Sequence, residues 1–267
     1  MVTIVTVAVR AQEATRIESK EKATRIANYI GHMFVQNDRP QAYLVEIEAP
    51  NVVVGSHFHR TDEFQVVLSN GFSLGGRSME AVAVHYAESF KPYGPLVGNE
   101  RGLSFFVLRA YSENGEFVMP EARAALQEAL VTLCLAKRRS STVSSGLRET
   151  EAASIEVTSL VPILSGAHGL AAFAVRMLSG EALEGPDPAL GGGQFHVIIN
   201  GSWERCEKLL GPRSVLWVGP EEPALRLRAG PGGLEAIIVQ FSRETKKVPA
   251  GVAAPRSYED ALLGRAT

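Results

Sequence analysis

Short apolar segments separated by turn-forming residues dominate the chain from residue 42 onward. The clearest occupy residues 43–50, 64–71, 79–87 and 103–111, and each is rich in Val, Phe or Leu. Gly, Pro and Asn separate them, and these residues favour turns because of their backbone conformations. Short strands at this spacing are typical of sandwiches and barrels rather than of βαβ units. The pattern therefore predicts an all-β fold.

Four other segments have patterns of their own. Residues 120–139 begin with a proline, carry leucines at helical spacing and end in basic residues, which predicts a helix. The polar residues 140–145 lack periodicity and predict a loop or linker. The apolar residues 1–9 predict a strand. Residues 13–30, where isoleucines occur among charges, predict a weakly amphipathic helix or an ordered arm.

The second half of the chain repeats the first at an offset of 131 residues. Residues 64–68 (FQVVL) match residues 195–199 (FHVII) at this offset. A proline and a Gly-Leu pair recur at the same offset: Pro92 and Pro223, and Gly102-Leu103 and Gly233-Leu234. One constant offset across three landmarks indicates a tandem repeat. We therefore expect two successive β-barrel domains, at residues 1–139 and 140–267, joined by the helix.

Composition excludes several classes of function. A hydrophobic content of 45% and a charged content of 21% are ordinary for a soluble globular protein. The net charge of −2 offers no basic surface, so we expect neither nucleic acid nor a membrane as a partner. Cys134 and Cys206 form no CxxC motif, which fits a reducing compartment and argues against thiolate metal sites. Because the chain shows neither a signal-peptide pattern nor a membrane-length apolar run, we expect a cytoplasmic protein.

Candidate chemistry concentrates at residues 55–65, which read GSHFHRTDEFQ. His57 and His59 are two residues apart, so on a strand their imidazoles leave the same face. After a polar turn, Glu63 can enter the returning strand and bring a carboxylate to the same place. Two imidazoles and a carboxylate form the ligand set of non-haem Fe(II) oxygenases, which also accepts Mn, Ni, Cu or Zn. We therefore expect His57, His59 and Glu63 to hold a divalent transition metal, with Fe(II) favoured.

This spacing resembles the first conserved motif of the cupin superfamily. That motif reads Gly, five residues, His-x-His, three or four residues, Glu, six residues, Gly. The His-x-His-x3-Glu core is matched in full, whereas the flanking Gly55 and Gly71 are displaced. Taken with the repeat, the whole chain resembles a bicupin, which implies two tandem jelly-roll barrels.

The second cupin motif is matched only in part. Residues 91–97 keep its Pro-x-Gly but place Val97 where the family has a fourth metal ligand. Either the metal keeps three ligands beside an apolar wall at Val97, or another histidine replaces the missing one. His85, at the end of a predicted strand among small residues, is the candidate substitute.

The repeat predicts that the C-terminal barrel lacks the metal ligands. The offset aligns them with Pro188, Leu190 and Gln194, none of which is a histidine or a carboxylate. His196 with Trp203 or Trp217 could line a ligand pocket there. We favour the alternative in which these residues pack in the barrel core.

Glu63 and Gln65 are the candidate catalytic residues of the N-terminal barrel. Gln65 shares the face of Glu63 and is expected to donate a hydrogen bond to it. Three aromatic residues are candidates for the pocket wall: Phe72, Tyr93 and Phe105.

The resemblance implies three classes of function. The first is a metal-dependent dioxygenase acting on a small organic substrate, similar to the bicupin quercetinase and diketone-cleaving enzymes. The second is a cupin-type isomerase or lyase that uses the metal as a Lewis acid. The third is a bicupin that binds a small molecule without turnover. A homodimer is also considered, because an exposed strand edge at residues 1–9 would invite pairing with a second copy.

Overall fold

The computed structural model confirms the all-β class. It describes residues 7–9, 11–19, 23–79, 82–150, 155–249 and 256–258. Within these residues there is one α-helix, α1 (Arg123–Thr132), which is shorter than the predicted 120–139. The helix ends early because Cys134 adopts a left-handed backbone conformation, with φ of 50°. No helix in these ranges is long and apolar enough to cross a membrane.

The chain divides into two compact units. One unit, termed the first barrel, comprises residues 15–142 and 246–267. The other, termed the second barrel, comprises residues 1–14 and 143–245. These boundaries differ from the predicted division at residue 139, because each end of the chain joins the barrel formed by the opposite half.

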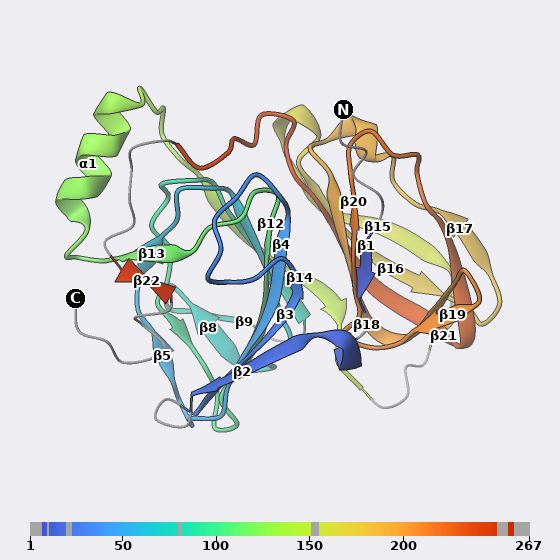
Figure 1. Ribbon diagram of the computed structural model, residues 1–267. Coiled ribbons are helices and arrows are strands. Elements are labelled where there is room, and N and C mark those ends of the chain that lie inside the picture. The colour runs from blue at the N-terminus through green and yellow to red at the C-terminus, as the bar shows by residue number, and fades with distance from the viewer. Residues whose placement is uncertain are drawn as a thin grey trace. The chain divides into compact units, whose positions relative to one another are not determined.

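Two strand pairs explain this exchange of the chain ends. Strand β1 (Val7–Val9) pairs with β20 (Val215–Val218), and strand β22 (Arg256–Ser257) pairs with β13 (Gly115–Val118) (Figure 1). The apolar start was expected to offer an edge to another subunit. Its described part instead pairs within the same chain, while residues 1–6 lie outside the described residues.

The described strands of the first barrel form three sheets. Besides β13 and β22, their bounds are β2 (Thr15–Ser19), β3 (Thr24–Ile30), β4 (Gln41–Ile47), β5 (Val53–Val54), β6 (His57–Phe58), β7 (Glu63–Val67), β8 (Phe72–Leu74), β9 (Arg77–Met79), β10 (Val82–Ala87), β11 (Leu96–Val97), β12 (Leu103–Arg109) and β14 (Ser140–Leu147). The largest sheet has the order β14-β10-β7-β12-β4-β3-β2. The others have the orders β5-β11-β8-β9 and β22-β13-β6.

Two predictions of non-strand structure in this barrel were wrong. The segment 13–30, expected to be a helix or an arm, forms the hairpin β2-β3, in which Ile17 lies opposite Ile26. Its isoleucines are too few to form an apolar face along a helix, but they suffice to form one apolar face of two paired strands. The segment 140–145, expected to be a loop, belongs to β14, whose polar residues suit an exposed sheet edge.

The second barrel is built on one sheet among the described residues. Besides β1 and β20, its strands are β15 (Ser159–Ser165), β16 (Ala171–Met177), β17 (Ala182–Glu184), β18 (Gln194–Arg205), β19 (Lys208–Leu210) and β21 (Arg226–Gln240). The order is β1-β20-β18-β21-β16-β15, with β17 on β21 and β19 on β18.

The 131-residue offset holds in the hydrogen-bond register of the two barrels. Strand β7 lies between β10 and β12, just as β18 lies between β20 and β21. The residues that face one another across these strands are Val66, Val84 and Phe106 in the first barrel, and Val197, Val215 and Ile237 in the second. The repeat predicted from sequence is therefore a repeat of structure.

Alternation along the strands directs one row of β7 into the first barrel. Val67 belongs to the interior cluster with Phe105 and Val107 of β12, which lie on the same face. Glu63 and Gln65 share that row with Val67, because side chains two residues apart leave one face of a strand. A carboxylate and an amide are thereby placed inside an otherwise apolar barrel.

We expect Gly102→Ala to destabilise the protein far more than Gly71→Ala. Both glycines have positive φ, of 98° and 67°, which a side chain disfavours. A Cβ at Gly102 would lie 1.9 Å from the carbonyl oxygen of Ile47, whereas one at Gly71 would meet nothing within 4 Å. Urea unfolding should show a loss of about 1 kcal/mol for Gly71→Ala and about 3 kcal/mol or more for Gly102→Ala. Equal losses would contradict the steric argument.

Candidate functional site

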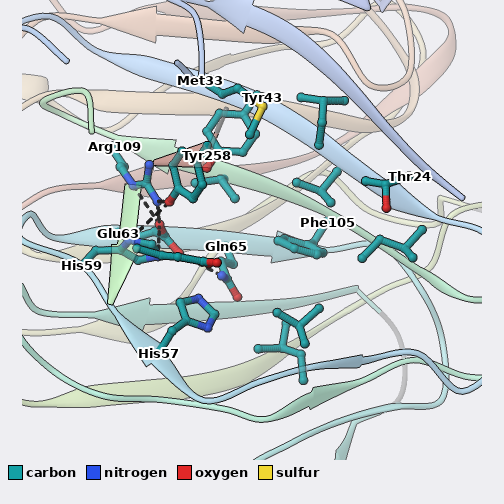
Figure 2. Close-up of a pocket in the computed structure, with 17 residues that line it drawn as sticks. Thr24, Met33, Tyr43, His57, His59, Glu63, Gln65, Phe105, Arg109 and Tyr258 are labelled. Atoms are coloured by element: carbon teal, nitrogen blue, oxygen red, sulfur yellow. Dashed lines mark hydrogen bonds and ion pairs between the residues drawn. The ribbon is translucent and has the colours of Figure 1, made fainter. Parts of the chain in front are cut away.

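A cavity of about 280 Å³ lies in the first barrel and has a polar and an apolar end. Figure 2 shows Arg109, Glu63 and His59 together at one end and Thr24 and Phe105 at the other. Most of the remaining lining is aliphatic or aromatic: Ile26, Met33, Tyr43, Val45, Ile47, Val54, Leu96 and Val107. Such a cavity suits a small, mainly apolar molecule that carries one polar group.

Strand β6 and the turn after it bring the two histidines to the polar end. Phe58 points away from the cavity and stacks on Phe117, with ring centroids 4.6 Å apart. His57 and His59, on either side of it, therefore face the interior, and both are buried. Both line the cavity, as the motif predicted.

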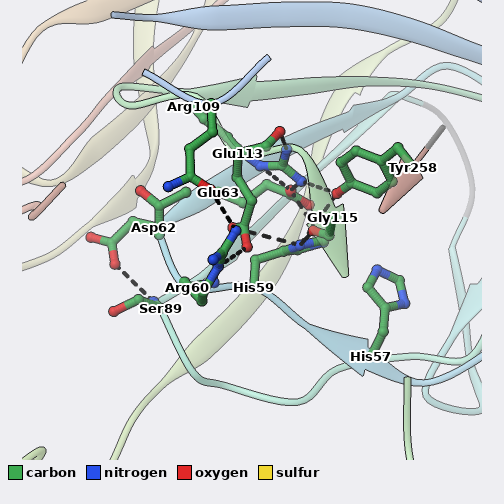
Figure 3. Close-up of polar contacts among 12 residues, drawn as sticks. His57, His59, Arg60, Asp62, Glu63, Ser89, Arg109, Glu113, Gly115 and Tyr258 are labelled. Carbon is green, nitrogen blue, oxygen red and sulfur yellow. Dashed lines mark hydrogen bonds and ion pairs between the residues drawn. The ribbon is translucent and has the colours of Figure 1, made fainter. Parts of the chain in front are cut away.

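The turn at residues 60–62 is held by buried polar contacts (Figure 3). Arg60 donates from Nε to Glu113 Oε1 at 2.7 Å. Asp62 accepts hydrogen bonds from the Ser89 backbone N–H at 2.8 Å and from the Tyr86 hydroxyl at 3.0 Å. These contacts fix the path of the chain between the histidines and Glu63.

Hydrogen bonds to backbone carbonyls set the tautomers of both histidines. His57 Nδ1 lies 2.7 Å from the Gly55 carbonyl oxygen, and His59 Nδ1 lies 3.2 Å from that of Gly115. A carbonyl oxygen only accepts, so each Nδ1 carries the proton. In the neutral rings, Nε2 then presents a lone pair. Burial lowers the pKa of His59 well below its ordinary value, so this ring is neutral.

Glu63 is an ionised carboxylate paired with Arg109. Its Oε2 accepts hydrogen bonds from Arg109 Nε at 2.8 Å and from Arg109 Nη2. Burial by itself would raise the pKa of Glu63, but the Arg109 charge, helped by His59 and by a hydrogen bond from Tyr93, lowers it to about 2. Arg109 Nη1 donates to Gln41 and its Nη2 also donates to Tyr258.

The Tyr93 hydroxyl lies at the centre of the polar end. It donates to Glu63 Oε1 at 2.7 Å and accepts from Gln65 Nε2 at 2.9 Å. It also lies 3.0 Å from His57 Nε2. Gln65 Nε2 donates to Glu63 Oε1 at 2.8 Å, which is the hydrogen bond expected from the sequence.

Two buried polar atoms beside this centre have no hydrogen-bond partner among the described residues: His85 Nε2 and Gln65 Oε1. The two residues lie opposite each other in the register of β10 and β7. The His85 ring packs against Tyr93 with centroids 4.7 Å apart, but His85 is not part of the cavity lining. Burial lowers its pKa to about 4, so the ring is neutral.

The chemistry of these atoms suits a divalent cation. Two imidazoles and an ionised carboxylate line the same cavity, and these groups are ligands of divalent transition metals. Over the described ranges, however, no three His, Cys, Asp or Glu side chains already have the spacing of a metal site. The Tyr93 hydroxyl lies between His57 Nε2 and Glu63 Oε1, at 3.0 and 2.7 Å. The donor set therefore fits a metal, provided that the hydroxyl leaves.

The cavity wall differs from the sequence prediction at three aromatic or apolar positions. Phe105 lines the cavity as predicted, but Phe72 and Tyr93 belong to the surrounding core. The apolar wall expected at Val97 was also wrong, because its neighbour Leu96 lines the cavity instead. Alternation on the short strand β11 turns only one of the two inward.

Sequence reasoning missed Arg109 and Tyr258. Arg109 ends the apolar strand β12, and a charged residue at the end of such a strand was a usable signal. The β7-β12 register, extended by one residue, places Arg109 on the same face as Glu63. Tyr258 lines the cavity from the C-terminal segment, and its hydroxyl lies 3.3 Å from His59 Nδ1. No local pattern signals that contact.

The second barrel has a neutral version of the same network. Gln194 and Gln240 occupy the places of Glu63 and Arg109, and Gln194 Nε2 donates to Gln240 Oε1 at 2.7 Å. His196 Nε2 lies 3.0 Å from Gln194 Oε1. The His196 ring packs against buried Trp203 with centroids 5.5 Å apart. The core interpretation of His196 and Trp203 is confirmed.

Comparison with known proteins yields matches only at the level of structure. No protein-family model and no curated protein sequence matches the chain. The bacterial pirin YhhW from Escherichia coli, solved with nickel(II), matches with a TM-score of 0.53 and 10% identity over 89% of this chain and 100% of the pirin. A protein from Nostoc punctiforme, named as a proposed dioxygenase, has a TM-score of 0.52 and 10% identity over 96% of this chain and 84% of its own.

Oxalate decarboxylase from Bacillus subtilis, studied for its Mn(II) centres, also matches. Its TM-score is 0.51, with 13% identity over 94% of this chain and 80% of the decarboxylase. Identities this low establish a shared fold. They leave the chemistry to be argued from the residues of this chain.

We expect Arg109→Gln to lower the free energy of unfolding by about 3–5 kcal/mol, because it leaves the Glu63 carboxylate buried without its partner. The double variant Glu63→Gln/Arg109→Gln reproduces the Gln194–Gln240 pair of the second barrel and should recover at least half of that loss. Urea unfolding of the wild type, both single variants and the double variant measures the coupling. A double variant as unstable as the sum of the singles would contradict the pairing.

His196 should make the second barrel sensitive to acid. Burial, with a smaller effect of Arg205, lowers the pKa of His196 to about 3. Between pH 7 and pH 5 the unfolded chain therefore binds a proton at this residue that the folded chain does not, and stability falls. Relative to His196→Gln, the wild type should lose about 2 kcal/mol more over this range. Parallel losses in urea unfolding at both pH values would rule out the effect.

Proposed function

Because the chain has the two-barrel cupin fold of these proteins, we propose that its first barrel is a metal-binding pocket for a small organic molecule. One observation carries the proposal: His57 and His59 both donate from Nδ1 to backbone carbonyls, which leaves each Nε2 directed to the polar end of the cavity. His59 Nε2 lies 3.5 Å from Glu63 Oε2, and His57 Nε2 lies 3.0 Å from the Tyr93 hydroxyl, which donates to Glu63 Oε1. Carbonyl acceptors hold metal-binding histidines in this way. The nickel and Mn(II) named for two of the structural neighbours support a divalent transition metal.

His57, His59 and Glu63 are the proposed ligands. Gln65 orients the Glu63 carboxylate by its hydrogen bond at 2.8 Å. Arg109 keeps Glu63 ionised and fixes its other oxygen. A bound Fe(II) or similar ion would supply Lewis acidity and open positions for oxygen and substrate.

His85 stays an alternative fourth ligand. Its buried Nε2 lacks a hydrogen-bond partner among the described residues, and an atom with a free lone pair can bind a metal ion. A bridging water would also satisfy this atom. The two alternatives differ in their effect on metal affinity, which His85→Ala would lower only if His85 is a ligand.

The cavity walls define what the metal would act on. The mainly aliphatic and aromatic lining suits a small hydrophobic body, and the polar end would meet one functional group. We propose oxygenase chemistry ahead of isomerase or lyase chemistry, because two imidazoles and one carboxylate form the ligand set of non-haem Fe(II) oxygenases and leave positions open for oxygen and substrate. The Nostoc punctiforme neighbour, named as a proposed dioxygenase, supports the same choice.

Metal-free binding of a small molecule is the second candidate. It is favoured by the contacts that Tyr93 and Arg109 make with Glu63, which together engage both carboxylate oxygens. In that case the same cavity would hold its ligand without turnover.

Elemental analysis of the purified protein, before and after anaerobic reconstitution with Fe(II), tests the proposal. We expect about one transition-metal ion per chain in the wild type and loss of most of it in His57→Ala and His59→Ala, because each removes a ligand. His168→Ala is the matched control, since His168 is an exposed histidine of the second barrel and should retain full metal content. No metal in the reconstituted wild type would favour metal-free binding instead.

A further inference from the structure

We propose that the Tyr93 hydroxyl holds the place of the ion in the metal-free protein and lowers metal affinity by having to be displaced. The inference rests on the proposed metal function and concerns how that site is regulated. It assigns Tyr93 a role distinct from those of the ligands His57, His59 and Glu63.

The position of the hydroxyl is the first support. It lies 3.0 Å from His57 Nε2 and 2.7 Å from Glu63 Oε1, two of the three proposed donor atoms. Gln65 Nε2 approaches it at 2.9 Å. A single buried oxygen thus contacts two of the three groups that are proposed to hold the cation.

A count of protons is the second support. The phenolic oxygen carries one hydrogen, and two acceptors compete for it: Glu63 Oε1 and, in the neutral ring, His57 Nε2. His57 Nδ1 already directs its hydrogen to the Gly55 carbonyl oxygen, 2.7 Å away. Glu63 Oε1 also accepts from Gln65 Nε2, and the single hydroxyl proton donated to Glu63 is not available to His57 Nε2, whereas a divalent cation would contact both acceptors.

The repeat supplies a third, independent support. At the offset of 131 residues, Pro92 aligns with Pro223 and Tyr93 aligns with Ala224. The second barrel lacks counterparts of the two histidines and the carboxylate, and it also lacks the tyrosine. The hydroxyl occurs in the barrel that has the ligands.

Displacement requires movement of the side chain only. The Tyr93 backbone is held by a two-way bridge to His57, with N–O distances of 3.0 and 3.1 Å. The three partners of the hydroxyl, His57, Glu63 and Gln65, all line the 280 Å³ cavity. A rotating phenol ring therefore has an adjacent space to enter.

The test is the affinity for Ni(II), measured by competition with a chromogenic chelator, in the wild type and in Tyr93→Phe. The variant lacks the hydroxyl, so binding no longer breaks its hydrogen bonds, and affinity should rise on the order of 10- to 100-fold. Tyr29→Phe is the matched control, because Tyr29 is also a buried tyrosine of the first barrel but does not line the cavity. Its affinity should equal that of the wild type.

The other outcomes separate the inference from the proposed function. Unchanged affinity in Tyr93→Phe would overturn the inference alone, and weaker affinity would overturn it by making Tyr93 a ligand. No Ni(II) binding by either protein would refute the metal function and the inference with it. If Tyr93→Phe does not fold, the ultraviolet difference spectrum of the wild type decides: a tyrosine perturbation on adding Ni(II), retained in Tyr29→Phe, supports displacement, and its absence refutes it.

Discussion

The buried ion pair between Glu63 and Arg109 is the interaction on which the rest of the first barrel depends. A carboxylate inside an apolar barrel is tolerated only if its charge is matched and its lone pairs are occupied. Arg109 meets both needs and directs its remaining donors to Gln41 and Tyr258. The pair thus connects β7 and β12 to β4 and to the C-terminal segment, and it keeps Glu63 charged.

The second barrel shows what the same scaffold does without that charge. Its central strands repeat the register of the first at a constant offset, yet Gln194 and Gln240 replace the ion pair. An amide pair satisfies its own hydrogen bonds and needs no counter-ion. Trp203 then packs beside His196 in an apolar core. The two barrels keep the same central strands and strand pairing. A few different inward-facing residues give the first barrel a polar cavity and the second a packed interior.

The polar end of the first barrel is assembled from segments far apart in the chain. His57 and Glu63 come from one motif, but Arg109 lies 46 residues beyond Glu63, and Tyr258 lies 149 residues beyond Arg109. The last of these contacts exists because the end of the chain returns to the first barrel. A local motif therefore specifies the histidines and the carboxylate, while distant residues determine their charge and hydrogen bonding.

The sequence by itself determined the strand pattern, the 131-residue repeat and the convergence of His57, His59 and Glu63. These follow from alternation and spacing over a few residues, which local geometry dictates. Only the tertiary structure decided that Arg109 neutralises Glu63, that Tyr93 lies between the donor atoms and that the chain ends exchange barrels. The hairpin at residues 15–30 and the inward turn of Leu96 rather than Val97 were decided in the same way. Each depends on which strands become neighbours and which side chain fills the remaining space, and packing sets both across the whole chain rather than within a local pattern.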